Sequence, residues 1–130
     1  MAAAAPRIVR TARDAACLFE PRLAGRRREA LLVAHLADDQ RLLRLTEEER
    51  GETGRIDLPV RSIISEAIRL DSAGLILAHC HPSGEPEPSD ADIVATRKLR
   101  ELGEALGLTL HDHLIFAGEA CVSFRQLGLL

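Results

Sequence analysis

The sequence contains no tryptophan, no tyrosine and only three phenylalanines. With a formal net charge of −3, it also lacks the excess of Lys and Arg with which proteins bind phosphates. Proteins that bind single strands usually add aromatic side chains on which bases stack. The one basic cluster, Arg26-Arg27-Arg28, is typical of a solvated turn. We therefore expect this chain alone to bind DNA only weakly and without sequence preference.

Long apolar runs and paired cysteines are also missing. No apolar run approaches the roughly 20 residues that cross a bilayer. The stretch from Met1 to Arg7 lacks the charged start and long apolar centre of a signal peptide, and is expected to be a frayed tail. The cysteines Cys17, Cys80 and Cys121 are odd in number and show neither CxxC nor disulfide-like spacing. We expect a cytoplasmic protein in a reducing compartment, with no membrane partner.

The sequence does contain enough hydrophobic residues, 46% of 130, for one domain with a buried core. Apolar periodicity and turn residues predict helices at 10–24, 60–70 and 89–106, and strands at 29–36, 41–45, 75–78, 108–116 and 121–124. The acidic, glycine-bearing segment 46–55 is predicted to be a solvated loop. Because helices and strands interleave, the expected fold class is α/β, with a mixed sheet flanked by helices.

We divide the chain into an N-terminal tail and helix, 1–24, and a main domain, 25–130. Pro21 is expected to end or kink the first helix. Helical spacing predicts the inward-facing residues, which are Ala16, Phe19 and Leu23 in the first helix, Ile63, Ile64, Ala67 and Ile68 in the second, and Ile93, Leu99, Leu102 and Leu106 in the third.

The segment "HCHPSGEPEPSDAD", residues 79–92, combines metal-binding side chains with stiffening prolines. On a strand, His79 and His81 face the same way and Cys80 faces the opposite way. Asp92 falls in the first turn of a helix for which Ser89 is a suitable N-cap. Two histidines and one carboxylate leave a position open for water, which is the pattern of catalytic zinc. The sequence thus favours a zinc site at a strand–helix junction.

Each half of this pattern also has a plainer interpretation. An isolated His-x-His is usually a surface pair or a pair satisfied within the core. A Ser-x-x-Asp sequence before an apolar helix is ordinarily a capping box, in which the Asp92 side chain bonds back to the Ser89 backbone. The full string, with seven residues between its two halves, is much rarer than either half and favours metal binding.

The same string resembles the JAMM signature, HxH followed by seven residues and SxxD, of the MPN+ metalloprotease families. It is most similar to the RadC-like bacterial branch, whose segment reads HNHPSG…PSxxDxxxT. The matching positions are His79, His81, Pro82, Ser83, Gly84, Pro88, Ser89, Asp92 and Thr96. The resemblance continues in "REALLVAHL", "HDHLIFAG" and "SFRQLGLL", and so covers roughly residues 25–130. It implies an MPN (JAB)-type domain.

The resemblance also implies roles for individual residues. His79, His81 and Asp92 would bind Zn²⁺. Glu29, at the start of the first predicted strand, matches the family's catalytic glutamate and would move the proton of the attacking water. Ser89 would stabilise the oxyanion. The implied activity is hydrolysis of an amide or isopeptide bond in a peptide or isopeptide-linked protein substrate.

Two rival functions belong to other classes. One is a non-catalytic MPN scaffold that keeps zinc for structure or assembly, although a scaffold has no need of Glu29 as a proton shuttle. The other is a DNA-repair accessory protein, suggested by the family's traditional label. RadC-like proteins usually carry an N-terminal helix-hairpin-helix region, for which this chain has no room, and this argues against a DNA role.

Several other residues near these motifs have weaker assignments. Cys80 stands where the branch usually has Asn, and strand alternation predicts a packed core thiol. His111 and His113 form a second His-x-His, for which we expect a core position or one behind a metal ligand. Asp112 is a candidate for orienting a ligand histidine. The side chains of Glu85 and Glu87 are expected to be solvated.

Overall fold

The computed structural model of the chain describes residues 7–48 and 58–130. The elements within these ranges are α1 (Ala12–Leu23), β1 (Leu31–Leu36), β2 (Leu42–Glu48), α2 (Val60–Arg69), β3 (Gly74–Cys80), α3 (Asp90–Ala105), β4 (Thr109–Ala117) and β5 (Ala120–Ser123). The predicted α/β class is therefore confirmed. Most of the predicted N-terminal tail and of the predicted acidic loop lies outside the described residues.

The strands form one mixed sheet with the order β2-β1-β3-β4-β5. The pairs β1–β2, β1–β3 and β4–β5 are antiparallel, whereas β3–β4 is parallel. A parallel pair requires a crossover connection, and α3 supplies it between β3 and β4. The end of β3 and the start of α3 are consequently joined by one loop at the C-terminal end of this central strand.

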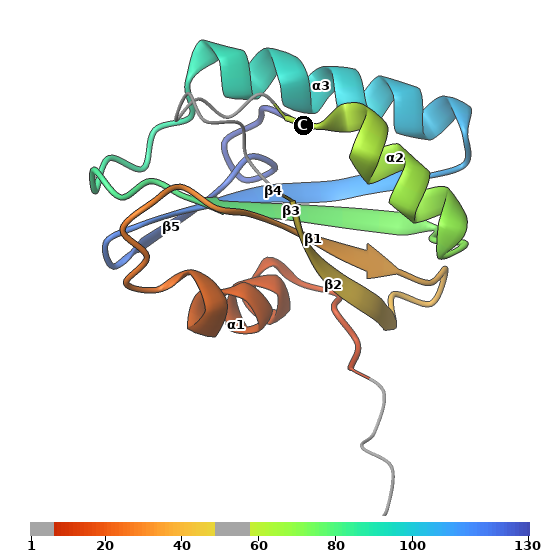
Figure 1. Cartoon of the computed structure of the whole chain (residues 1–130), viewed down its shortest axis with the longest axis horizontal. Helices are drawn as coiled ribbons and strands as arrows, with labels where there is room; N and C mark the ends of the chain where they lie inside the picture. Colours follow the sequence, from red (N-terminus) through yellow and green to blue (C-terminus); the bar gives the residue numbers. More distant parts are fainter. Residues whose placement is uncertain (1–6, 49–57) are drawn as a thin grey trace, which may run out of the picture.

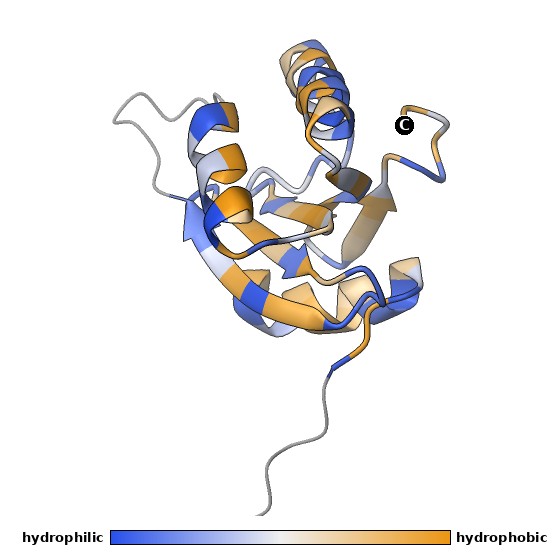
Figure 2. Ribbon diagram, turned by 90° about the vertical axis from the view of Figure 1, so that its right-hand side faces the viewer, coloured by the Kyte–Doolittle hydropathy of each residue, from blue (hydrophilic) through white to orange (hydrophobic). Residues whose placement is uncertain are grey.

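Helices cover both faces of this sheet (Figure 1): α1 lies on one face, and α2 and α3 lie on the other. Each face has its own core. On the α1 face, Phe19 packs with Ile76, Ala78 and Cys80, whereas Leu75 and Leu77 pack with residues of α2 and α3. All seven residues of β3 are buried, because this central strand is covered on both faces. Figure 2 shows hydrophobic residues on the inner side of α2 and hydrophilic residues on its outer side.

Several predicted boundaries shift in the structure. The first strand begins at Leu31, so Glu29 lies two residues ahead of it. The second strand extends to Glu48, because Glu48 still pairs with Leu31. The predicted strand 75–78 lengthens to Gly74–Cys80 and includes His79. The first helix runs through Pro21 to Leu23, so the proline does not end it.

Some residues predicted to face inward are exposed. Ile68, Leu102 and Leu106 are 62%, 43% and 55% exposed. In α3, Leu99 is buried as predicted, and the other buried residues are Asp92, Thr96 and Gly103. Gly103 allows the helix to approach the start of the next strand closely, since a Cβ there would lie 3.0 Å from the Leu108 carbonyl oxygen. The face of α3 that packs on the sheet is thus the one that carries Thr96, Leu99 and Gly103, and it differs slightly from the face predicted from the spacing of the leucines.

No helix in residues 7–48 and 58–130 is long and apolar enough to cross a membrane.

The rotation of α3 can be tested with two leucines of the same helix. Leu99 is 1% exposed and Leu102 is 43% exposed. Leu99→Ala should lower the free energy of unfolding by about 2–5 kcal/mol, because it leaves a cavity in the core. Leu102→Ala, as the matched control, should change it by no more than about 0.5 kcal/mol. Urea unfolding of both variants measures this difference, and equal losses would contradict the orientation of the helix.

Candidate metal centre

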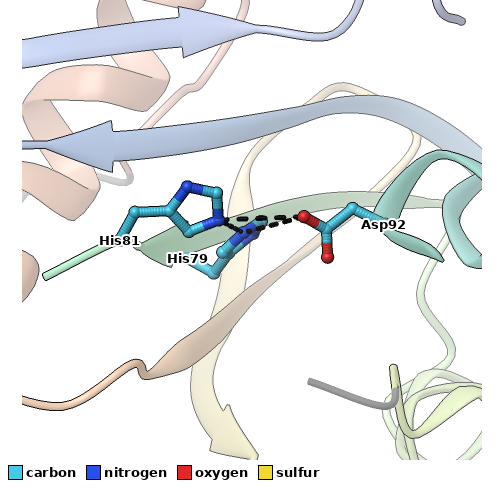
Figure 3. A group of neighbouring side chains, drawn as sticks. All are labelled: His79, His81 and Asp92. Carbon is cyan, nitrogen blue, oxygen red and sulfur yellow. Dashed lines mark hydrogen bonds and ion pairs between the residues drawn. The ribbon is translucent and has the colours of Figure 1, made fainter. Parts of the chain in front are cut away.

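Three side chains from the end of β3 and the start of α3 converge on one point (Figure 3). His79 and His81 come from the strand and the residue just after it, and Asp92 comes from the first turn of the helix. One ligand atom from each lies within 4.8 Å of the others. His79 is fully buried, and the side chains of His81 and Asp92 are 12% and 8% exposed. The cluster is therefore largely shielded from solvent.

The spacing of these atoms fits a small divalent cation. The Nε2 atoms of His79 and His81 are 2.8 Å apart, and each is 3.7 Å from Oδ2 of Asp92. Bonds of about 2.0–2.2 Å from a tetrahedral ion to nitrogen and oxygen separate neighbouring ligand atoms by about 3.4 Å. The observed separations lie on both sides of that value. The side chains need only small adjustments to bind one ion.

The carboxylate of Asp92 is held in place by the cap of α3. The Ser89 hydroxyl accepts a hydrogen bond from the Asp92 backbone N–H at 3.0 Å. In return, Oδ2 of Asp92 accepts one from the Ser89 backbone N–H at 3.1 Å. This is the capping box expected from the sequence. It does not compete with the metal centre, because a carboxylate oxygen has more than one lone pair.

The imidazole of His81 is oriented by the loop that follows it. Its Nδ1 lies 2.8 Å from the Glu85 carbonyl oxygen. A carbonyl can only accept, so Nδ1–H donates and Nε2 presents its lone pair towards His79 and Asp92. The side chains of Glu85 and Glu87 are exposed, in agreement with the expectation that they are solvated.

A second imidazole, that of His113 on β4, lies directly behind His79. Nδ1 of His79 is 2.5 Å from Nε2 of His113, and Nδ1 of His113 is 2.8 Å from the Thr96 hydroxyl on α3. The ring of His113 also stacks on Phe124 at 4.5 Å. The prediction of a core position is therefore confirmed for His113, which lies behind the candidate ligand His79. Thr96, one of the positions that match the RadC-like segment, lies four residues after Asp92 on the same helix face.

Burial keeps His113 neutral. Its side chain is almost completely buried, and this desolvation holds the pKa of the imidazole well below its usual range. The nearby His79 and His81 lower this pKa further. A neutral His113 can accept a hydrogen bond at Nε2 from Nδ1–H of His79 while donating from Nδ1–H to Thr96. This hydrogen bond would fix His79 in the tautomer whose Nε2 lone pair can bind a metal ion.

Cys80 faces the opposite side of the sheet from His79, as predicted. It is 4% exposed and belongs to the core on the α1 face. Its thiol donates to the Arg28 carbonyl oxygen at 3.3 Å. Cys80 therefore packs in the core on the α1 face. It is adjacent in sequence to both His79 and His81, but its side chain points to the opposite face of the sheet from the candidate metal centre.

The second His-x-His does not act as a pair. A bulge opposite Leu75 and Ile76 makes His111 an extra residue in β4. His111 lines a cavity with residues from the start of α1, whereas His113 faces α3. The bulge breaks the alternation on which the pairing of the two histidines depends.

Asp112 has a different role from the one suggested by the sequence. Its carboxylate accepts hydrogen bonds from the backbone N–H groups of His113 and Arg125 and from the Ser123 hydroxyl. These bonds tie β4 to β5 and to the segment after it. The expectation that Asp112 orients a ligand histidine side chain is replaced by this structural role.

Glu29 lies at the same end of the sheet as the cluster. The antiparallel pairing of β1 with β3 places Leu31 opposite His79. The backbone contact continues to Ala30, whose carbonyl oxygen accepts from the Cys80 N–H at 3.3 Å. Extending this register by one residue brings half-buried Glu29 opposite His81. The structure therefore brings all five predicted site residues to one end of the sheet.

Comparison with known proteins gives one family and many relatives. The family model described as "RadC-like JAB domain" matches residues 9–129. A UPF0758 protein of Rhodobacter capsulatus is 42% identical over 108 residues, which are 83% of this chain and 50% of the relative. UPF0758 proteins of Ruegeria pomeroyi and Photorhabdus laumondii are 41% and 36% identical, over 83% and 82% of this chain and 48% and 46% of their own. The chain thus spans about half the length of these relatives.

The geometry predicts one divalent metal ion per chain, bound by His79, His81 and Asp92. Replacing any of the three with Ala should abolish stoichiometric binding, since each supplies one of only three protein ligands. His111→Ala is the matched control, because His111 belongs to the other His-x-His and should leave the metal content unchanged. Elemental analysis of the purified proteins gives the answer. A full complement of metal in the His79→Ala/His81→Ala double variant would contradict the site.

Proposed function

Since the chain belongs to the RadC-like JAB domain family, we propose that it is a zinc-dependent hydrolase of amide or isopeptide bonds. The observation that carries this proposal is the convergence of two histidine nitrogens and one carboxylate oxygen within 4.8 Å. Two His and one carboxylate are a common ligand set of catalytic zinc, which keeps its remaining position open. A bound zinc ion would supply Lewis acidity, lowering the pKa of water from about 15.7 towards about 7 and polarising a carbonyl.

Glu29 is the proposed general base and acid. It lies outside the three-residue ligand cluster but at the same strand end, by the register of β1 against β3. A carboxylate in this place can take a proton from the attacking water and return it to the leaving amine. Glu29 matches the catalytic glutamate of the metalloprotease families that the sequence resembles. Its proposed role is therefore to move protons rather than to bind the metal.

Ser89 is proposed to stabilise the oxyanion while it caps α3. A hydroxyl has one hydrogen to donate and two lone pairs with which to accept. The cap uses an accepting lone pair, because the Asp92 backbone N–H donates to the Ser89 oxygen. The hydroxyl hydrogen is thus available for a developing oxyanion. The capping role and the proposed oxyanion role are therefore chemically compatible.

The proposed substrate is a peptide or an isopeptide-linked protein. The JAMM-type arrangement supports an amide carbonyl as the reacting group. The net charge of −3 and the absence of Trp and Tyr argue against a nucleic acid substrate for this chain alone.

Glu29→Gln separates proton transfer from metal binding. The amide keeps the shape of the side chain but cannot accept a proton at neutral pH. The variant should retain its metal and its melting temperature, while hydrolysis falls by about 10²–10⁴-fold. Zinc content, thermal melting and cleavage of a substrate found by screening peptide and isopeptide libraries would be measured on both proteins. Equal cleavage rates would show that Glu29 is not the base. Zinc without cleavage in either protein would favour a scaffold.

Ser89→Ala tests the oxyanion role, and Thr11→Ala provides a matched control. Thr11 caps α1 with an equivalent capping box through Asp14, away from the metal centre. Loss of either cap should cost about 0.5–2 kcal/mol of stability. Ser89→Ala alone should also lower the turnover, by about 10²–10³-fold. Melting and turnover of both variants would be compared. If both variants lose stability and neither loses turnover, Ser89 is only a cap.

A further inference from the structure

A cavity of about 700 Å³ lies on the α1 face, at the same end of the sheet as the metal centre. Its volume is in the range of ligand pockets, about 300–1,000 Å³. Its walls come from α1, from the turn after α1, from the β4–β5 hairpin, and from His81 and Pro82. His81 is therefore shared between this cavity and the candidate metal centre.

The interior of the cavity is largely apolar. Small and apolar side chains line it, among them Ala16, Leu23, Phe116 and Ala120. All three cysteines of the chain line it as well: Cys17 from α1, Cys80 from β3 and Cys121 from β5. Thiols pack as small hydrophobic groups, so they add to the apolar surface. An apolar side chain would therefore find a largely apolar environment here.

The rim carries a few charges, and these restrict the ligand further. Arg26 is paired with Glu47 at 2.7 Å and is thereby neutralised. Arg13, Glu20 and Glu119 also line the cavity and form no ion pair in the described part of the chain. Together these three give the rim a charge of −1. A basic residue beside the apolar side chain is therefore more compatible with the rim than an acidic one.

We propose that this cavity binds a large apolar side chain of the peptide substrate, close to the scissile bond and beside a basic residue. The inference rests on the proposed hydrolase function and adds the substrate specificity of the same site. The inference is based on the position of the cavity next to the candidate metal centre, because His81 belongs to both and Pro82 follows it in the cavity wall. An extended peptide that passes over His81 would place its reacting carbonyl on the metal side and an adjacent side chain in the cavity.

The thiols that line the cavity allow the binding of a peptide in it to be measured without any catalytic reaction. Cys17 and Cys121 are exposed, so N-ethylmaleimide can modify them from within the cavity. The probes are two capped tetrapeptides, acetyl-Gly-Lys-Leu-Gly-amide and acetyl-Gly-Lys-Gly-Gly-amide, added at millimolar concentrations to the full chain supplied with zinc. The leucine peptide should slow modification of both thiols several-fold, whereas the glycine peptide should not. Mass spectrometry of the labelled protein follows each site separately.

A variant that fills the cavity provides the second arm. Ala120→Trp places an indole in the cavity and should remove the protection by the leucine peptide. Ala105→Trp, at the exposed end of α3, is the matched control and should preserve it. The chain has no tryptophan of its own, so each variant has one fluorophore. A blue-shifted emission in Ala120→Trp relative to Ala105→Trp would verify that the indole is buried, and thermal melting would verify folding.

The outcomes separate this inference from the proposed function. If only the leucine peptide protects the two thiols, and Ala120→Trp removes this protection, the proposed binding of an apolar side chain in the cavity is supported. If no peptide is cleaved in the same experiments, only the hydrolase proposal fails. Equal modification rates with both peptides overturn the cavity assignment. The cavity assignment is also overturned if the leucine and glycine peptides are cleaved at the same rate and Ala120→Trp does not change that rate. The hydrolase proposal would survive this second result.

Discussion

The alternation of side chains along the central strand β3 determines where the chemistry of this protein can lie. Every residue of β3 is buried, so each side chain must fit one of two covered faces. His79 faces α3 and meets His81 and Asp92, whereas the next residue, Cys80, joins the core beneath α1. A shift of the strand by one residue would bury the thiol at the metal centre and move the imidazole to the other layer. The pairing of β3 with β1 and β4 therefore protects the site as well as the fold.

The start of α3 contributes the other half of the centre by ordinary helix capping. The same Asp92 oxygen that accepts the Ser89 N–H also faces both imidazoles. Behind His79, the contacts to His113 and from His113 to Thr96 join three elements: β3, β4 and α3. His79 is thus oriented by a buried imidazole, Asp92 by the helix cap, and His81 by a backbone carbonyl of the loop that follows it. Such support lowers the entropy that must be lost when a metal ion binds.

The sequence predicts the elements of this fold better than their faces. Hydrophobic periodicity was sufficient for the mixed α/β architecture, and the Ser-x-x-Asp spacing correctly identified Ser89 as the N-cap of α3. Leu102 and Leu106 were misjudged because periodicity does not show that Gly103 packs closely against Leu108. The bulge at His111 was equally invisible, since it depends on pairing between strands far apart in sequence. Local patterns thus identified the candidate ligands, whereas the neighbours that orient them required the tertiary structure.

X-ray absorption spectroscopy of the zinc-loaded chain tests the central claim most directly, because it identifies the atoms bound to the metal. The three thiols all line a cavity that shares His81 with the proposed centre, so sulfur ligation is the relevant competitor. Our account predicts only nitrogen and oxygen ligands at about 2.0–2.2 Å, with the scattering pattern of two imidazoles. Sulfur at about 2.3 Å, or a spectrum without imidazole, would contradict it.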